Sequence, residues 1–188
     1  MRARAALFAL AAVAAATALA APVTYKIDPA HTYPSLEFPH MGISVWRGKF
    51  TSTRGTVVLD REARAGTVDV TIEAASIDFG HQVMNEAAAS AEWLNADMNP
   101  TLRYVGDIRF EGDRPARVEG KLTLMGVTRP VPLKIESFKC IPHPLFRREV
   151  CGADASGAFD RADFGMKQYT SDGMGHITLR IQVEAMRE

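Results

Sequence analysis

The side chains best suited to metal binding or nucleophilic chemistry are five histidines and two cysteines. No histidine has another at i+2 or i+4, so the sequence holds no local histidine pair of the kind that binds zinc. It also holds no GxSxG nucleophile elbow, no HExxH motif, no CxxCH haem motif and no glycine-rich phosphate loop. We therefore predict no catalytic residue, no metal site and no enzymatic activity. The histidines are His31, His40, His81, His143 and His176.

His40 and a few carboxylates are the remaining polar candidates. His40 lies in an apolar stretch and has two interpretations: a core histidine bonded to a backbone carbonyl, or a polar group that contacts the head of a ligand. Asp160, Asp163 and Asp172 lie near expected strand ends. A glycosidase-type acid pair would need two of them to converge, and nothing in their spacing selects a pair. Turn caps and solvated charges are the alternative that the pattern favours.

Cys140 and Cys151 are the only thiols. An oxidising compartment favours a disulfide between them, and the chain-entropy model gives about 2.5–3 kcal/mol for so short a loop. The enclosed residues 141–150 contain two prolines and show no clean period, which predicts a protruding loop or hairpin pinned at its base. The alternative, a zinc or redox pair, needs CxxC-type spacing or convergent histidines.

The apolar residues recur mainly with a period of two. Ile177, Leu179 and Ile181, for example, alternate with Thr178 and Arg180. Strict alternation predicts antiparallel strands with one buried and one solvated face, and about eight or nine such strands close as a barrel or fold as a sandwich. The predicted strand regions are 23–27, 35–50, 53–59, 67–73, 102–111, 117–124, 131–136, 155–164 and 177–184.

One segment breaks this period. Residues 81–94 are rich in alanine and contain neither glycine nor proline, and Met84, Ala87, Ala88 and Ala91 fall at helical spacing. We predict a short helical insertion around residues 81–95 in an otherwise all-β chain. No linker, repeat or low-complexity tract divides residues 21–188, so we predict a single domain there.

The first twenty residues have the order of a secretory signal peptide. Arg2 and Arg4 precede an apolar run over 5–19, and Ala18 and Ala20 fit the small-x-small cleavage rule. The run is short for a spanning helix, which needs roughly 20 apolar residues, although an uncleaved anchor is the alternative. We expect cleavage before Ala21 and a periplasmic protein that does not span the membrane.

Charge and composition restrict the class of partner. Lys plus Arg and Asp plus Glu number 22 each, so the formal net charge is zero, and removal of the two signal arginines makes the chain slightly acidic. A nucleic-acid-binding protein would normally carry a basic excess. We therefore predict no nucleic-acid partner and no tight electrostatic binding to an anionic membrane.

Several motifs resemble YceI-like proteins. Tyr25–His31 (YKIDPAH) is similar to the opening of that family, and Arg161–Met166 (RADFGM) is similar to its RxDFG element. The most specific match is Gly120–Val131 (GKLTLMGVTRPV). The resemblance runs in order from Tyr25 to Glu184.

The resemblance implies a lipocalin-like antiparallel eight-stranded β-barrel with an elongated apolar cavity. It implies a polyprenyl or quinone-type isoprenoid lipid as ligand, and no cofactor besides it. The function expected is transport, storage or sequestration of that lipid, whose burial gives about 0.8 kcal/mol per CH₂. The residues predicted to line or gate the cavity are Phe38, His40, Trp46, Phe50, Met84, Trp93, Met125 and Phe164.

The sequence departs from the family pattern in two places. Residues 84–89 (MNEAAA) replace a charged RDxHL stretch, and the segment bounded by the two cysteines marks a subgroup. Two rival functions follow: a binding module that docks a redox or membrane partner through residues 141–150, and an enzyme that acts on isoprenoid substrates. A homodimer also stays open.

Overall fold

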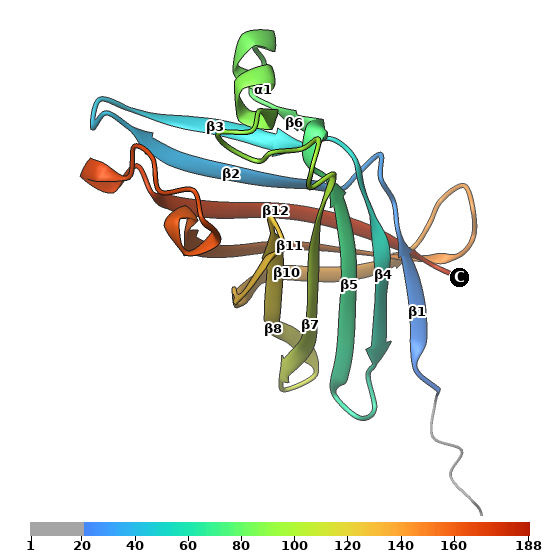
Figure 1. Cartoon of the computed structure of the whole chain (residues 1–188). Coiled ribbons are helices and arrows are strands. Elements are labelled where there is room, and N and C mark those ends of the chain that lie inside the picture. Colours follow the sequence, from blue (N-terminus) through green and yellow to red (C-terminus); the bar gives the residue numbers. More distant parts are fainter. Residues whose placement is uncertain (1–20) are drawn as a thin grey trace, which may run out of the picture.

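The computed structural model describes residues 21–188, and the predicted signal peptide lies outside the described residues. The described chain forms one twelve-stranded sheet with a single α-helix, α1 (Figure 1). The strands are β1 Val23–Ile27, β2 Tyr33–His40, β3 Ser44–Phe50, β4 Thr53–Asp60, β5 Ala65–Glu73, β6 Ile77–Asp78, β7 Thr101–Glu111, β8 Arg114–Leu124, β9 Val127–Pro130, β10 Leu133–Pro142, β11 Glu149–Asp160 and β12 His176–Arg187.

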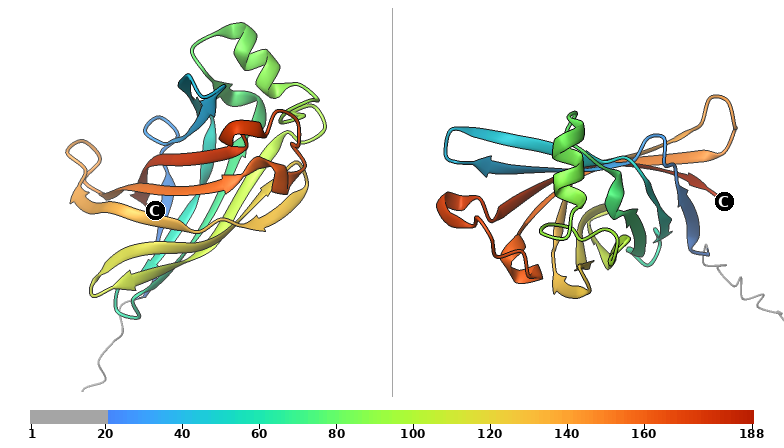
Figure 2. Two further views of the ribbon diagram at one scale, coloured as in Figure 1. Left: turned by 90° about the vertical axis from the view of Figure 1, so that its left-hand side faces the viewer. Right: turned by 45° about the horizontal axis from the view of Figure 1, so that its top comes forward.

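Eight antiparallel strands close into a barrel, because β12 pairs with β1 as well as with β11 (Figure 2). The order around the barrel is β1, β4, β5, β7, β8, β10, β11, β12. The last residues of β12 make the closure, with Arg187 opposite Tyr25 and Ala185 opposite Ile27. Closure gives every barrel strand a hydrogen-bonded neighbour on both sides, so the remaining sheet edges lie in the extension through β2, β3 and β6 and in β9. The predicted eight-stranded antiparallel barrel is confirmed, and the sandwich alternative is excluded.

The β2–β3 hairpin extends the sheet beyond the barrel. β12 pairs with β2 only as far as Thr178 opposite Glu37, whereas β2 continues to pair with β3 as far as His40 opposite Ser44. Residues 38–46 therefore lie beyond the last β12–β2 pair. Figure 1 shows this end of the hairpin projecting from one side of the barrel, while the β10–β11 hairpin projects from the other.

The alternation seen in the sequence separates the barrel interior from its exterior. In β7, Leu102, Tyr104 and Ile108 are buried, whereas Arg103 and Asp107 on the opposite face are exposed. The inward residues of the barrel strands form one hydrophobic cluster. The period of two thus predicted which side chains face inward.

The helical insertion is shorter than its alanine content suggests. α1 spans Gln82–Ala89, stands at one end of the barrel and has no buried residue (Figure 2). It ends at Ser90, whose backbone is extended and whose N–H donates to Ala87 O, and Asn95 then takes a left-handed φ of 47°. Ala88 and Ala89 pack only partly against the core, and Asn85 accepts a hydrogen bond from Phe79 N at 2.7 Å, so few tertiary contacts hold α1. The rest of the predicted segment forms turns.

The predicted strand over 155–164 also ends early. β11 stops at Asp160, and residues Arg161–Phe164 form a 3₁₀ helix. The Asp160 carboxylate accepts a hydrogen bond from Ala162 N at 2.8 Å, and Gly165 ends the turn with φ 99°. Asp160 therefore caps a turn, which is the alternative that the sequence pattern favoured over a glycosidase-type acid pair. No helix within residues 21–188 is long and apolar enough to cross a membrane.

Candidate functional site

The barrel encloses an elongated cavity of about 750 Å³. Its wall is almost entirely apolar, because the inward-facing residues of all eight barrel strands contribute to it. Buried wall hydroxyls mostly have partners: Thr32 Oγ1 donates to Glu184 O at 3.2 Å, and Tyr104 OH donates to Val131 O at 2.9 Å. Thr53 Oγ1 has none within the described residues. The cavity thus offers much apolar surface and few free polar groups.

The structure places six of the eight predicted lining residues at this cavity. They come from two regions that are distant in sequence: the β2–β3 hairpin, and α1 with the turn that follows it. Their role in ligand binding stays a prediction, because a position in the cavity wall does not by itself show contact with a ligand. The six are Phe38, His40, Trp46, Phe50, Met84 and Trp93.

Met125 and Phe164 do not line the cavity, which corrects the predicted set. Met125 lies in the β8–β9 turn with φ 51°, one position after the inward-facing Leu124, so the alternation of β8 has already ended. Phe164 is 1% exposed on the 3₁₀ helix and packs edge-on against Phe159, with ring centroids 5.1 Å apart. Phe159 lines the cavity, and Phe164 supports it from behind.

Aromatic rings gather where the cavity reaches the β2–β3 hairpin. The rings of His40 and Trp46 stack at 3.9 Å with an interplanar angle of 15°. Phe38 contacts both Trp46 and Phe79 edge-on. The ring of His40 therefore packs on another aromatic wall residue, and His40 itself lines the cavity.

The cavity opens to solvent at this end. Met41 is 64% exposed and Tyr169 is 66% exposed, and both line the cavity. Tyr169 stacks on Trp93 with ring centroids 6.3 Å apart. We refer to this end, between the β2–β3 hairpin and the segment 161–175, as the mouth.

Arg161 organises one side of the mouth and was not among the predicted site residues. It is 5% exposed, and its guanidinium donates to the carbonyls of Met174, Met166, Gln168 and Tyr169 while lying 4.7 Å from the Trp93 ring. Burial lowers the pKa of Arg161 from its ordinary value, against the opposing charge of Asp160. Its position in the RxDFG motif was a signal, but the motif alone does not show that the side chain collects carbonyls.

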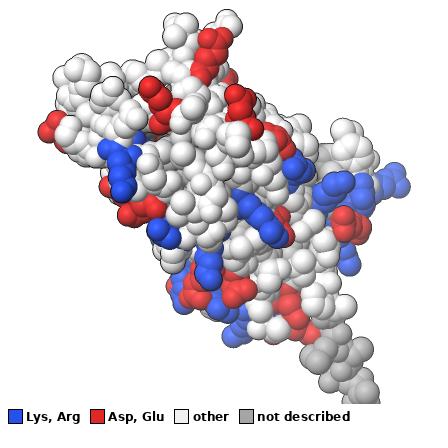
Figure 3. Space-filling view, in the orientation of Figure 1, with Lys and Arg blue, Asp and Glu red and all other residues white. Residues whose placement is uncertain are grey.

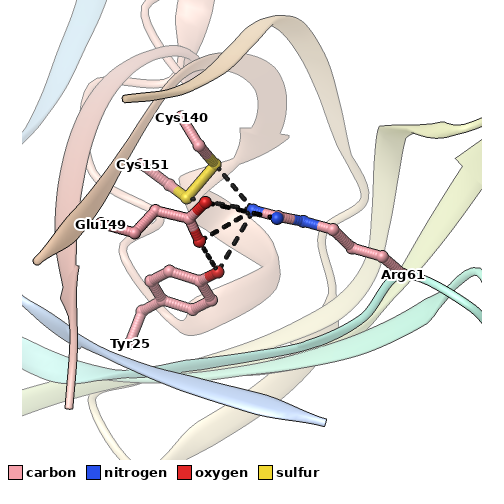
Figure 4. Close-up of a disulfide and its surroundings, with 5 residues drawn as sticks. All are labelled: Tyr25, Arg61, Cys140, Glu149 and Cys151. Atoms are coloured by element: carbon pink, nitrogen blue, oxygen red, sulfur yellow. Dashed lines mark hydrogen bonds and ion pairs between the residues drawn. A yellow bond between two sulfur atoms is a disulfide. The ribbon is translucent and has the colours of Figure 1, made fainter. Parts of the chain in front are cut away.

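The disulfide lies at the other end. Cys140 and Cys151 are directly opposite each other in the β10–β11 pair and are bonded to each other, so the predicted bridge at the base of a hairpin is confirmed. Arg61 Nη2 lies 3.0 Å from Cys140 Sγ and 3.1 Å from Glu149 Oε1, and Tyr25 OH donates to the same carboxylate (Figure 4). Because both sulfurs are in the disulfide, this group presents no thiolate to a metal.

The surroundings of Tyr25 and Glu149 shift the pKa values of both side chains. Burial foremost, and then the hydrogen bond to Glu149, raise the pKa of Tyr25 to about 12. Burial opposes ionisation of Glu149, but the hydrogen bonds from Tyr25 and Arg61 outweigh it and lower the pKa of this carboxyl. The neutral phenol and the ionised carboxylate are thus the forms that the folded state favours.

A closed antiparallel barrel around one apolar cavity defines the chain as a lipocalin-like binding barrel. The model of the YceI-like domain matches residues 25–185, so the chain belongs to the YceI-like family, as its motifs indicated.

Relatives of this family match over most of the chain. A UPF0312 protein of Pseudomonas aeruginosa LESB58 is 31% identical over 168 residues, 87% of either chain. Protein YceI of Salmonella arizonae is 30% identical over 185 residues, 96% of either chain. These identities extend along nearly the full length of both proteins.

Solved structures share the fold. Burkholderia cenocepacia BcnA matches with a TM-score of 0.67 at 22% identity, over 85% of this chain and 99% of that one. A polyisoprenoid binding domain from Saccharophagus degradans, implicated in plant cell wall breakdown, matches with a TM-score of 0.63 at 11% identity, over 88% of this chain and 99% of that one. At these identities the likeness concerns the barrel itself.

Proposed function

We propose that this protein binds one long apolar lipid of the isoprenoid type, a polyprenyl or quinone chain, inside the barrel, and carries, stores or sequesters it in the periplasm. The apolar cavity of about 750 Å³ is the observation that carries the proposal. At about 30 Å³ for a water-sized group, it holds on the order of 25 non-hydrogen atoms. The isoprenoid chemistry rests on the family and on the polyisoprenoid-binding neighbour.

The cavity wall favours burial over chemistry. Each CH₂ moved from water into it contributes roughly 0.8 kcal/mol, so affinity grows with chain length and needs few polar contacts. A polar ligand would lose its hydrogen bonds to water and find few free partners on this wall. We therefore propose a binding protein that returns its ligand chemically unchanged. The disulfide and the predicted signal peptide support an oxidising compartment.

Two substitutions on one strand test the proposal. Ala155 is 9% exposed and lines the cavity, so Ala155→Phe fills part of it. Ala158 lies on the same strand, is exposed and does not line the cavity, so Ala158→Phe is the matched control. We expect lipid mass spectrometry of the purified protein to show an apolar lipid with the wild type and Ala158→Phe, and a strongly reduced amount with Ala155→Phe. A wild-type protein that neither copurifies with an apolar lipid nor takes one up would refute the proposal.

The β10–β11 hairpin supports a second candidate function, a module that docks a redox or membrane partner. Leu145 is 79% and Phe146 is 58% exposed, beside the exposed Arg147 and Arg148, and interfaces often combine such groups. Substitution of Phe146 and Arg147 separates the two functions. Loss of partner binding with unchanged lipid uptake would favour the module.

A further inference from the structure

The free end of the β2–β3 hairpin is an uncharged projection. Residues 38–46, which we name the projecting tip, contain no Asp, Glu, Lys or Arg. A Glu37–Arg47 ion pair at 2.9 Å marks its base. Ile43 is 80%, Met41 64% and Val45 46% exposed. Figure 3 shows an uncharged lobe at the upper left of the molecule, with acidic and basic side chains bordering it below.

The turn of the projecting tip is built against local preference. Met41 has φ 54° and Gly42 has φ 70°, and Ile43 N donates to His40 O at 3.1 Å. Tight hairpin turns of this kind usually carry Asn, Asp or Gly, which accept a positive φ and are soluble. Ile43 at the exposed apex neither lines the cavity nor packs on the hydrophobic core, so a contact outside the chain accounts for this side chain better.

The projecting tip is continuous with the cavity. His40, Met41 and Trp46 belong to both, and Tyr169 faces the same opening. An apolar surface therefore runs from the interior to the apex without crossing a charged side chain of the projecting tip. A lipid that follows this surface keeps its chain out of water along the way.

We propose that the projecting tip inserts into the acyl layer of a lipid bilayer, so that the ligand passes between bilayer and cavity along it. This inference rests on the proposed lipid-binding function. From Glu37 to His40 the strand rises about 10 Å at roughly 3.3 Å per residue. The headgroup region on one side of a bilayer is about 5–8 Å thick, so the apex reaches the hydrocarbon.

The lack of charge favours a bilayer over a protein partner and predicts how it binds. A protein interface normally carries a polar rim around its apolar centre, and residues 38–46 supply no charged part of one. Insertion that depends on apolar side chains needs no anionic lipid and is insensitive to salt, because screening acts on charges.

Flotation with neutral phosphatidylcholine vesicles tests the proposal. Ile43 and Val45 do not line the cavity, so the double variant Ile43→Ser/Val45→Ser leaves the lipid site intact. Ile141 and Leu145 on the other hairpin are 45% and 79% exposed, nearly equal to Val45 and Ile43, so Ile141→Ser/Leu145→Ser is a matched control. We expect the first double variant to lower vesicle binding at least tenfold and the second to change it less than twofold, in both low and high salt.

Three results would overturn the proposal: a wild type that does not float, a projecting-tip variant that floats as the wild type does, or a control that loses binding by the same factor. Thermal unfolding of both double variants identifies any loss that comes from misfolding, in which case Ile43→Asn alone replaces the double variant. Lipid that still copurifies with a non-floating wild type would leave the proposed function standing and refute only the bilayer contact.

Discussion

The two projecting hairpins expose similar apolar side chains in different settings. At the mouth, Ile43 and Val45 are 80% and 46% exposed, and at the other end Leu145 and Ile141 are 79% and 45% exposed. The β2–β3 tip has no charged residue and continues into the cavity, whereas the β10–β11 hairpin is basic and crossed by a disulfide. Equal exposure of apolar side chains therefore does not make the two hairpins equivalent, because they differ in charge and in continuity with the cavity.

The two ends are also held by different forces. At the mouth, the Arg161 guanidinium binds four backbone carbonyls of the segment that follows it. At the disulfide end, a covalent bond closes the hairpin, and Arg61, Glu149 and Tyr25 form hydrogen bonds around it. The hydrogen bonds of Arg161 can break and re-form, whereas the disulfide holds the two strands of its hairpin together covalently. The following predictions test this contrast.

We expect the largest effect from Arg161→Leu, because it leaves several carbonyls at the mouth without their donor. The free energy of unfolding should fall by roughly 3 kcal/mol in denaturant titration, and hydrogen exchange should speed up in residues 161–175. Arg180→Leu, at an exposed arginine of β12, is the control and should change stability by less than about 0.5 kcal/mol. Equal stability of the two variants would show that Arg161 does not hold the mouth.

The disulfide should contribute slightly less. Cys140→Ala/Cys151→Ala removes a short covalent loop, and we expect unfolding in denaturant to become easier by about 2.5–3 kcal/mol. The exchange rates of residues 161–175 should stay unchanged, because the bridge lies at the other end. Faster exchange at the mouth would contradict the separation of the two ends.

Tyr25 should give the disulfide end a dependence on alkaline pH. Its pKa is raised to about 12 in the folded protein, against about 10 when unfolded, so its stabilising effect is present below pH 10 and is lost as the pH rises through 12. Tyr25→Phe should flatten the fall of the denaturation midpoint between pH 10 and 12. Tyr33→Phe, which removes a hydroxyl exposed at the surface, should leave that fall as in the wild type.

The smallest effect concerns the wall between the two ends. Thr32 and Thr53 are both 2% exposed, but Thr32 Oγ1 bonds the backbone of Glu184, whereas Thr53 Oγ1 has no partner within the described residues. Thr53→Val should therefore stabilise the protein by up to about 1 kcal/mol, and Thr32→Val should destabilise it by about 1 kcal/mol. A clear destabilisation by Thr53→Val in thermal unfolding would reveal a partner for that hydroxyl.

The sequence predicted some of the residues that line the cavity. The alternation of side chains along a strand is a local property, so the sequence could assign one face of the β2–β3 hairpin to the interior. The residues of that face that were predicted to line the cavity do line it: Phe38, His40, Trp46 and Phe50. The alternation no longer applies once a strand ends. Met125 lies in the turn after β8, so its assignment to the cavity wall was wrong. The contacts among Tyr25, Arg61 and Glu149 span up to 124 positions and leave no local pattern.

The amino-acid sequence by itself determined the all-β class and the inward face of the regularly alternating strands, because these follow from a period of two. With only two thiols it also limited any disulfide to the Cys140–Cys151 pair. The tertiary structure decided that β12 pairs with β1 to close the barrel, that the interior is hollow, and that Arg161 holds the mouth. Those features depend on which distant residues meet, and that is set by the packing of the whole sheet rather than by any one strand.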